Sequence, residues 1–163
     1  MKSELSRVIR LDRIGPDGLD SVVEATPDEC AALAERMMLP GILALSCRFR
    51  LTCEGPLVFG EGHLRARVVQ TCVISLDEFE TAVEERFRIR FVPAGQEDDD
   101  SDPESDDEIP YEGNVVDIGE AAAEQLGLVL DPYPRKPGAE LPESDAEVPP
   151  HPFAGLGALR RTN

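Results

Sequence analysis

The sequence predicts an α+β domain: an antiparallel β-meander or partly closed barrel with two helices, a disordered acidic loop and a C-terminal tail. Three stretches between Gly41 and Phe91 alternate apolar and polar residues with a period of two, as half-buried strands do. Two other stretches, beginning at Thr26 and Asp117, place apolar residues three and four positions apart behind a capping residue, as amphipathic helices do. Long strands twist and curl, so partial closure into a barrel is expected.

Two short strands come first, at Arg7 to Asp12 and at Ser21 to Ala25, on either side of the turn signal Gly15-Pro16-Asp17-Gly18. The spacing of Thr26 and Glu29 then predicts a capping box, in which each side chain bonds the backbone N–H of the other residue. The apolar stripe of this first helix comprises Cys30, Leu33, Ala34, Met37 and Met38. The dipeptide Pro40-Gly41 ends the helix.

The long strands follow one another with short connections. The inward side of the first is expected to comprise Leu43, Leu45, Cys47, Phe49, Leu51 and Cys53. A turn is expected at Gly55-Pro56, and Gly60 and Gly62 make the connection after it flexible. This connection leads to a second strand at His63 to Ile74. The third strand is expected at Phe79 to Phe91, and all three together predict an antiparallel meander with one face toward the core.

The second helix is expected to begin at Asp117, with Glu120 completing a capping box, and to end at Asp131-Pro132. Its inward stripe comprises Ile118, Ala121, Ala122, Gln125, Leu126 and Val129. We expect one domain over residues 1–133, with an inserted acidic loop at 95–109. Residues 134–163 are expected to form a Pro-rich linker and a short tail.

The charge is concentrated in one segment. Glu97 to Glu108 holds nine acidic residues and no basic one, so without it the formal net charge of -17 becomes -8 (-17 + 9). Any basic surface must therefore be a local patch. The four cysteines form no CxxC pair, and the first ten residues have no apolar core of the kind that a signal peptide needs. We expect a soluble cytoplasmic protein with reduced thiols, without a membrane partner.

Three segments together resemble the YceD family: VVQTCVISLDEF at Val68 to Phe79, YEGNVVDIGEAAAEQLGLVLDPYPRK at Tyr111 to Lys136, and HPFAGLGALR at His151 to Arg160. The resemblance covers nearly the whole chain in the family's order of parts. The family is associated with accumulation of the large-subunit ribosomal RNA in bacteria and plastids. The resemblance therefore implies a non-enzymatic factor in 23S rRNA accumulation or ribosome assembly, with 23S rRNA or large-subunit ribosomal proteins as partners.

The same resemblance bears on the cysteine-bearing turn. Many members of the family have a CxxC motif there, whereas this chain keeps Cys72 and has Ser75 at the partner position. We therefore expect neither zinc nor redox chemistry. All four cysteines are expected to be buried as small apolar side chains.

Seven arginines are expected on the polar side of the meander: Arg48, Arg50, Arg65, Arg67, Arg86, Arg88 and Arg90. Like charges on adjacent strands repel each other, so an anion should lie near them. Three sources are open: rRNA phosphates, neighbouring glutamates such as Glu54, Glu80 and Glu84, or the acidic loop folding back. The pattern is also that of an ordinary solvated sheet face. Aromatic side chains are expected on the core side, which disfavours base stacking.

The acidic run has three interpretations. It could imitate a polyanion and hold a basic ribosomal protein, it could guard the arginine face until RNA displaces it, or it could simply solubilise the chain. The candidate partner-binding residues are Asp98, Asp99, Asp100, Asp106, Asp107, Phe153 and Leu156. The last two belong to the tail, which could dock on a partner or on its own domain.

Motifs for catalysis are missing from the sequence. The two histidines, His63 and His151, lie in no nucleophile motif, and no glycine-rich phosphate loop joins a strand to a helix. His63 and Cys72 alone cannot make a tetrahedral zinc site. We expect no enzyme activity, no metal, no cofactor and no small-molecule substrate.

Overall fold

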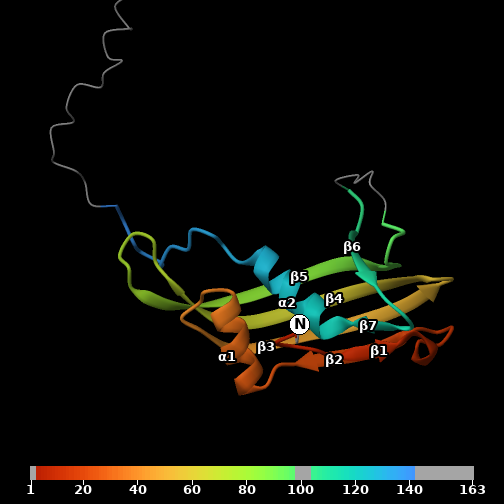
Figure 1. Cartoon of the computed structure of the whole chain (residues 1–163). Coiled ribbons are helices and arrows are strands. Elements are labelled where there is room, and N and C mark those ends of the chain that lie inside the picture. Colours follow the sequence, from red (N-terminus) through yellow and green to blue (C-terminus); the bar gives the residue numbers. More distant parts are fainter. Residues whose placement is uncertain (1–2, 98–103, 142–163) are drawn as a thin grey trace, which may run out of the picture.

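The computed structural model of the chain describes residues 3–97 and 104–141. Its centre is a five-stranded sheet with the strand order β2-β3-β4-β5-β6 (Figure 1). The strands span Leu19–Glu24 (β2), Gly41–Glu54 (β3), Leu57–Thr71 (β4), Glu78–Pro93 (β5) and Asp107–Tyr111 (β6). All neighbours are antiparallel except β5 and β6, which are parallel. The α+β class and the β3-β4-β5 meander are confirmed.

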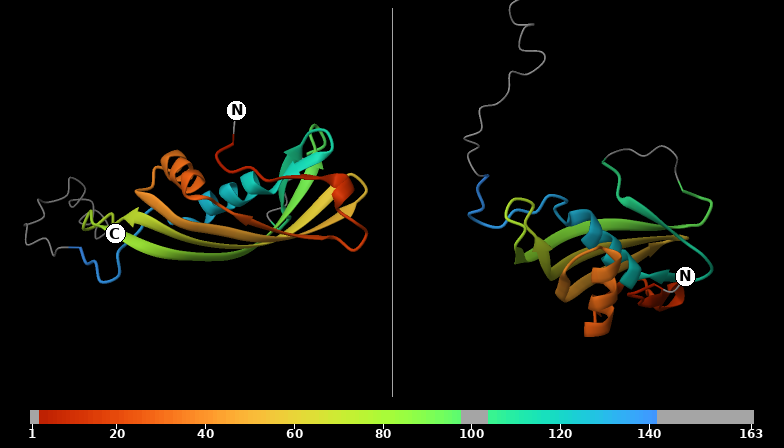
Figure 2. Two further views of the ribbon diagram at one scale, coloured as in Figure 1. Left: turned by 90° about the horizontal axis from the view of Figure 1, so that it is seen from below. Right: turned by 60° about the vertical axis from the view of Figure 1, so that its left-hand side comes forward.

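A second, two-stranded sheet pairs β1 (Val8–Arg10) with β7 (Val115–Asp117), and the short 3-10 helix η1 (Leu11–Arg13) follows β1. Helices α1 (Pro27–Arg36) and α2 (Ile118–Val129) lie on the same side of the large sheet, which curves around them (Figure 2). Within residues 3–97 and 104–141, no helix has both the length and the apolar character needed to cross a membrane.

The expected partial closure into a barrel is wrong, because the large sheet stays open with β2 and β6 as its edges. The concave side is occupied by α2, whose Ala121, Ala122, Ala123 and Leu126 are buried. A helix with its side chains is about 10 Å wide, so a sheet wrapped around one is held open. The apolar face is thus covered by helices rather than by the sheet itself.

The alternation expected for β3 is confirmed from Leu45 to Leu51, where every second side chain is buried. It fails at Leu43, which is 51% exposed. The pairing with β4 shifts between Ile42 and Ala44, as at a β-bulge, so Ile42 takes the buried position. A single extra residue therefore reverses the side chains at the start of the strand.

The expected start of the second long strand at His63 is also wrong, because β4 begins at Leu57 and therefore includes Gly60 and Gly62. Gly62 pairs with Phe87 of β5, and a Cβ atom on Gly62 would lie 2.1 Å from Cζ of that ring. The ring in turn packs edge-on against Phe49, with 5.7 Å between the centroids. Glycine is therefore needed at this position because an aromatic ring crosses over the strand.

The capping box of α1 is confirmed. The Glu29 N–H donates to Thr26 Oγ1 at 3.3 Å, and the Thr26 N–H donates to Glu29 Oε2 at 2.8 Å. The expected inward position of Met38 is wrong, since this side chain is 91% exposed. Met38 has a φ of 54° and follows the end of the helix, so it leaves the apolar stripe of α1.

Asp117 caps the start of α2, one residue before the helix begins at Ile118, and its carboxylate accepts the N–H groups of Gly119 and Glu120 at 3.0 and 3.1 Å. The Glu120 side chain does not complete a capping box but pairs with Arg36 at 2.8 Å. The first turn lies close to the start of β1, since a Cβ atom on Gly119 would be 2.6 Å from Arg7 N. Helix α2 ends at Val129, just before the expected stop.

The acidic loop is shorter than expected, because β6 begins at Asp107 and residues 107–109 are strand rather than loop. Residues 98–103 of the loop and residues 142–163 of the tail lie outside the described residues, and so do Phe153 and Leu156. The segment that follows α2 contacts the β4–β5 turn, where the Val73 N–H donates to the Pro134 carbonyl at 3.0 Å. The domain boundary after residue 133 stays a prediction.

Candidate nucleic-acid interface on the outer sheet face

The seven predicted arginines all lie on one surface, which we call the outer sheet face: the face of the five-stranded sheet opposite α1 and α2. They occupy outward positions of β3, β4 and β5, since the residues that alternate with them are the ones packed in the core. The three strands are direct neighbours in the sheet. The structure therefore brings these side chains onto one face, as the alternation predicted.

Carboxylates of the same molecule neutralise five of the seven. The ion pairs are Arg50–Asp20 (3.0 Å), Arg65–Glu84 (3.2 Å), Arg67–Glu80 (Nε–Oε1 2.7 Å), Arg88–Asp106 (3.3 Å) and Arg90–Glu108. Two of these carboxylates are among the glutamates that the sequence analysis suggested, and two belong to the end of the acidic run. The face is thus a mixed ionic surface rather than a uniformly basic one.

Arg48 and Arg86 differ from the other five. No described residue forms an ion pair with either guanidinium, and both side chains are exposed. The strand register places them in one row, because Arg48 pairs with His63 and His63 pairs with Arg86. We call these three residues the Arg48–His63–Arg86 row. Arg48 on β3 and Arg86 on β5 thus flank the imidazole of His63, which lies on the strand between them, β4.

The histidine of this row has a carboxylate partner. His63 Nε2 lies 2.7 Å from Glu84 Oε1, and the same oxygen accepts from Arg65. The hydrogen bond with His63, followed by that with Arg65, lowers the pKa of Glu84. Glu84 thus contacts both His63 and Arg65, which are two residues apart on the same face of β4. The predicted strand has His63 at its first position, and the period-two spacing of His63, Arg65 and Arg67 indicates a common face for these three residues.

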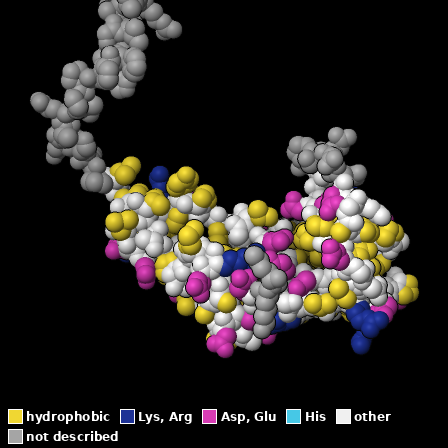
Figure 3. Space-filling model, viewed as in Figure 1, with side chains coloured by type: hydrophobic (Ala, Val, Ile, Leu, Met, Phe, Trp, Pro, Cys, Tyr) yellow, Lys and Arg dark blue, Asp and Glu magenta, His cyan; other side chains and the backbone are white. Residues whose placement is uncertain are grey.

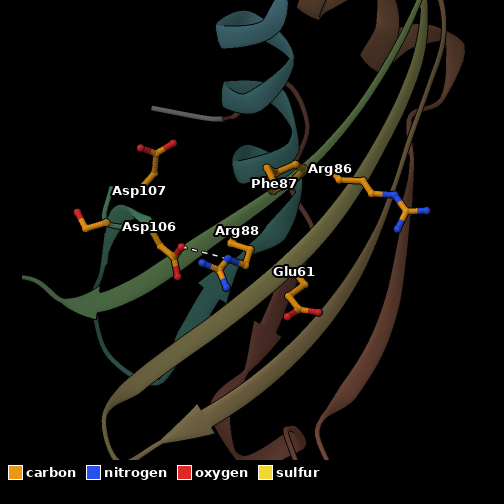
Figure 4. Close-up of a pocket in the computed structure, with 7 residues that line it drawn as sticks. Glu61, Arg86, Phe87, Arg88, Asp106 and Asp107 are labelled. Atoms are coloured by element: carbon orange, nitrogen blue, oxygen red, sulfur yellow. Dashed lines mark ion pairs between the residues drawn. The ribbon is translucent and has the colours of Figure 1, made fainter. Parts of the chain in front are cut away.

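A shallow hollow of about 430 Å³ lies at the edge of this face, where β5 extends beyond the start of β6 (Figure 4). Arg88 and Asp106 face each other in it, whereas Arg86 points away from them across the neighbouring strands. The pair in the hollow is therefore already satisfied. Arg86 is the lining cation that remains available to an external anion.

Of the seven predicted partner-binding residues, two lie in the part of the chain that the structure describes and five do not. Asp106 pairs with Arg88 at 3.3 Å, and Asp107 accepts from Gln125 Nε2 at 3.4 Å, so both have partners within the chain. Asp98, Asp99, Asp100, Phe153 and Leu156 lie outside the described residues. A role for the acidic run in holding a basic protein therefore stays a prediction.

The cysteines have different environments. Burial raises the pKa of Cys47 to about 12, and it also raises the pKa of Cys30 and of Cys53, although Cys53 is only partly buried. Cys72 is 0% exposed, as expected. Hydrogen bonds from the Ser75 side chain and N–H, and then from the Lys136 N–H, lower its pKa to about 6.

The sulfur of Cys72 accepts from Ser75 N at 3.4 Å and from Lys136 N at 3.3 Å. It thus joins the β4–β5 turn to the segment after α2, which the sequence spacing could not indicate. His63 lies nine residues away on the outer sheet face. In the part of the chain that the structure describes, no group of three or more His, Cys, Asp or Glu side chains could hold a metal ion.

Comparison with known proteins gives one match. The family model described as "Large ribosomal RNA subunit accumulation protein YceD" matches residues 60–160. No curated protein and no solved structure matches the chain. The matched range includes most of β4 and all of β5, β6, β7 and α2, and therefore contains His63 and Arg86 of the row but not Arg48.

Proposed function

The chain belongs to the YceD family, whose name implies a role in large-subunit ribosomal RNA accumulation, and we propose that it fills this role as a non-enzymatic factor contacting the RNA backbone. The contact surface is the outer sheet face. The observation that supports this choice is the Arg48–His63–Arg86 row, whose two guanidinium groups have no ion-pair partner among the described residues.

The chemistry of the row suits phosphate. A guanidinium group donates two parallel hydrogen bonds to a phosphate and stays charged at any physiological pH. The five paired arginines can contribute less, because a phosphate would have to displace a carboxylate from each. Exposed ion pairs are worth only about 0–1 kcal/mol, so such displacement is possible but offers little gain. Binding should therefore depend mainly on Arg48 and Arg86.

Recognition of bases is not supported by this surface. The expectation that all aromatic rings face the core is wrong for Phe59, which lies at an outward position of β4, but this ring is partly buried. Among the outward positions of the described β3, β4 and β5, Phe59 is the sole aromatic residue. Stacking of successive bases needs several exposed rings, so contacts to the RNA backbone and to its shape are favoured.

A matched pair of double variants tests the proposal. Arg48→Ala/Arg86→Ala removes the unpaired cations, and Arg65→Ala/Arg67→Ala removes two paired cations from the same face. We expect the first variant to lose cosedimentation with large-subunit precursors and to lower large-subunit rRNA when it replaces the native chain in cells. The second should retain most of both activities.

The Arg65→Ala/Arg67→Ala control separates the effect of where the arginines lie from the effect of net charge, since both double variants lose two positive charges. Equal losses in the two variants would show that only the net charge matters. Unchanged sedimentation and unchanged rRNA in Arg48→Ala/Arg86→Ala would remove the outer sheet face from the mechanism while leaving the family role in place.

A further inference from the structure

A second surface lies on the helix side of the sheet, opposite the outer sheet face. It is a cleft of about 440 Å³ between β6, β7 and α2, which we call the β6–α2 cleft. Its apolar lining includes Val8, Ile109 and Val115. Figure 3 shows hydrophobic side chains next to Asp and Glu side chains over this part of the molecule. An apolar surface bordered by charge is typical of a binding site for another chain.

The charge in this cleft is of one sign. Four carboxylates line it, those of Glu112, Asp117, Glu120 and Glu124, and none of the described residues that line it is Lys, Arg or His. Two of them have partners: Asp117 caps α2, and Glu120 pairs with Arg36. Neither Glu112 nor Glu124 forms a side-chain hydrogen bond or ion pair with any described residue.

The environment of Glu124 is unfavourable to its charge. Burial, and then the neighbouring charge of Glu120, raise the pKa of Glu124. A cation placed beside it would relieve both effects, since it would attract the carboxylate and offset the repulsion from Glu120. Arg36 offsets part of this repulsion, but neither Glu112 nor Glu124 has an ion-pair partner among the described residues, so the cleft keeps two carboxylates with which a cation can pair.

The apolar part of the cleft is likewise open to solvent. Val8 is 56% exposed and Val115 is 38% exposed, although they belong to the paired strands β1 and β7. Covering such side chains with an apolar group is favourable, because it removes apolar surface from water. A suitable occupant thus combines positive charge with an apolar side chain.

We propose that the β6–α2 cleft docks a basic segment of a partner protein, in which an apolar side chain lies between Lys or Arg side chains. Nucleic acid does not fit, because phosphates would be repelled by the four carboxylates. The cleft and the outer sheet face lie on opposite sides of the sheet, so the two surfaces can be occupied together. The factor would then hold RNA on one side and a basic protein segment on the other.

The test uses the full chain and a fluorescent peptide of alternating lysine and leucine, with a glutamate–leucine peptide as the charge control. We expect the lysine peptide to bind and the glutamate peptide not to bind. Glu112→Gln/Glu124→Gln should weaken binding about tenfold, since it removes the two carboxylates of the cleft that have no partner within the described chain. Glu35→Gln/Glu54→Gln, which removes two exposed carboxylates elsewhere, should leave binding within about twofold.

Three results would overturn the proposal. The first is no binding of the lysine peptide at low salt. The second is an equal loss in the two double variants, which would indicate general charge attraction. The third is tighter binding of a peptide with the chain's own sequence 152–163, which contains Phe153, Leu156, Arg160 and Arg161, because the tail would then be the occupant. None of these results depends on RNA binding, so they leave the proposed function untouched.

Discussion

At the scale of single residues, Arg7 connects parts of the chain that are far apart in sequence. Its guanidinium donates to both oxygens of Glu29, each at 2.8 Å, and to the Glu24 carbonyl at 2.9 Å. Its backbone N–H donates to Asp117 Oδ1 at 2.8 Å. One residue thus ties the start of α1, the end of β2 and the start of α2 together.

This contact predicts a dependence of stability on pH. The hydrogen bond from Arg7, and then that from the Thr26 N–H, lower the pKa of Glu29 to about 2. A lowered carboxyl pKa stabilises the fold above the ordinary carboxyl pKa of about 4.3, and this contribution is lost as the pH falls toward 2. Glu29→Gln should therefore lower the free energy of unfolding by about 1 kcal/mol at pH 7.

Thermal or urea unfolding between pH 7 and pH 3 measures this effect. The difference between the native chain and Glu29→Gln should shrink as the pH falls below about 4. Glu35→Gln is the control, because Glu35 is an exposed carboxylate of the same helix. A constant difference across the whole pH range would show that Arg7 does not stabilise the ionised form of Glu29.

At the scale of elements, the end of α1 has a residue in an unfavourable conformation. The Leu39 N–H donates to the Ala34 carbonyl at 2.8 Å, and the Met38 N–H donates to the Glu35 carbonyl at 3.2 Å, which together form a Schellman motif. Met38 occupies the position where glycine is usual and has a φ of 54°. Its exposed side chain gains no packing in exchange.

Met38→Gly should therefore stabilise the protein. Glycine takes a positive φ without steric cost, and relief of the left-handed conformation is worth about 1 kcal/mol. The midpoint of thermal unfolding should rise by about 2–5 °C. Met38→Ala is the control, because it removes the same side chain and keeps the Cβ atom. An equal rise for both variants would assign the effect to the exposed methionine rather than to the backbone.

At the scale of the whole molecule, the unpaired arginines of the sheet, Arg48 and Arg86, lie on the side opposite the unpaired carboxylates of the cleft, Glu112 and Glu124. The formal net charge is -17, yet the outer sheet face has seven arginines and the β6–α2 cleft has four carboxylates. The long-range field therefore repels RNA, and the proposed RNA binding must come from short-range contacts with few phosphates. Only Arg48 and Arg86 are unpaired among the face's seven arginines, as far as the described residues show.

A weak dependence of RNA affinity on salt follows from this. Two phosphate contacts predict that the logarithm of the association constant falls with the logarithm of salt concentration with a slope of about -1.4. Titration of a labelled large-subunit rRNA fragment at several salt concentrations measures the slope. Arg48→Ala/Arg86→Ala should bring it close to zero. A slope several times steeper would mean that another basic surface, formed by other residues, dominates binding.

Patterns within a few residues of one another determined much of this fold. The period of two predicted the buried side chains of β3 from Leu45 to Leu51, and the Thr26–Glu29 spacing predicted the capping box of α1. The common face of the arginines also followed from this period. These features were predictable because neighbouring residues on one strand or helix create them, whatever the rest of the chain does.

The tertiary structure alone decided which charges meet and which surfaces stay open. Glu84 reaches His63 across 21 positions, and Tyr111 reaches the Pro56 carbonyl across 55, and such contacts depend on strand register. The antiparallel register of β4 and β5 brings Glu84 beside His63, and the parallel pairing of β6 with β5 brings Tyr111 to the turn between β3 and β4. Sequence alone therefore predicted the arginine face, but only the fold showed that five of its cations are neutralised and two are not.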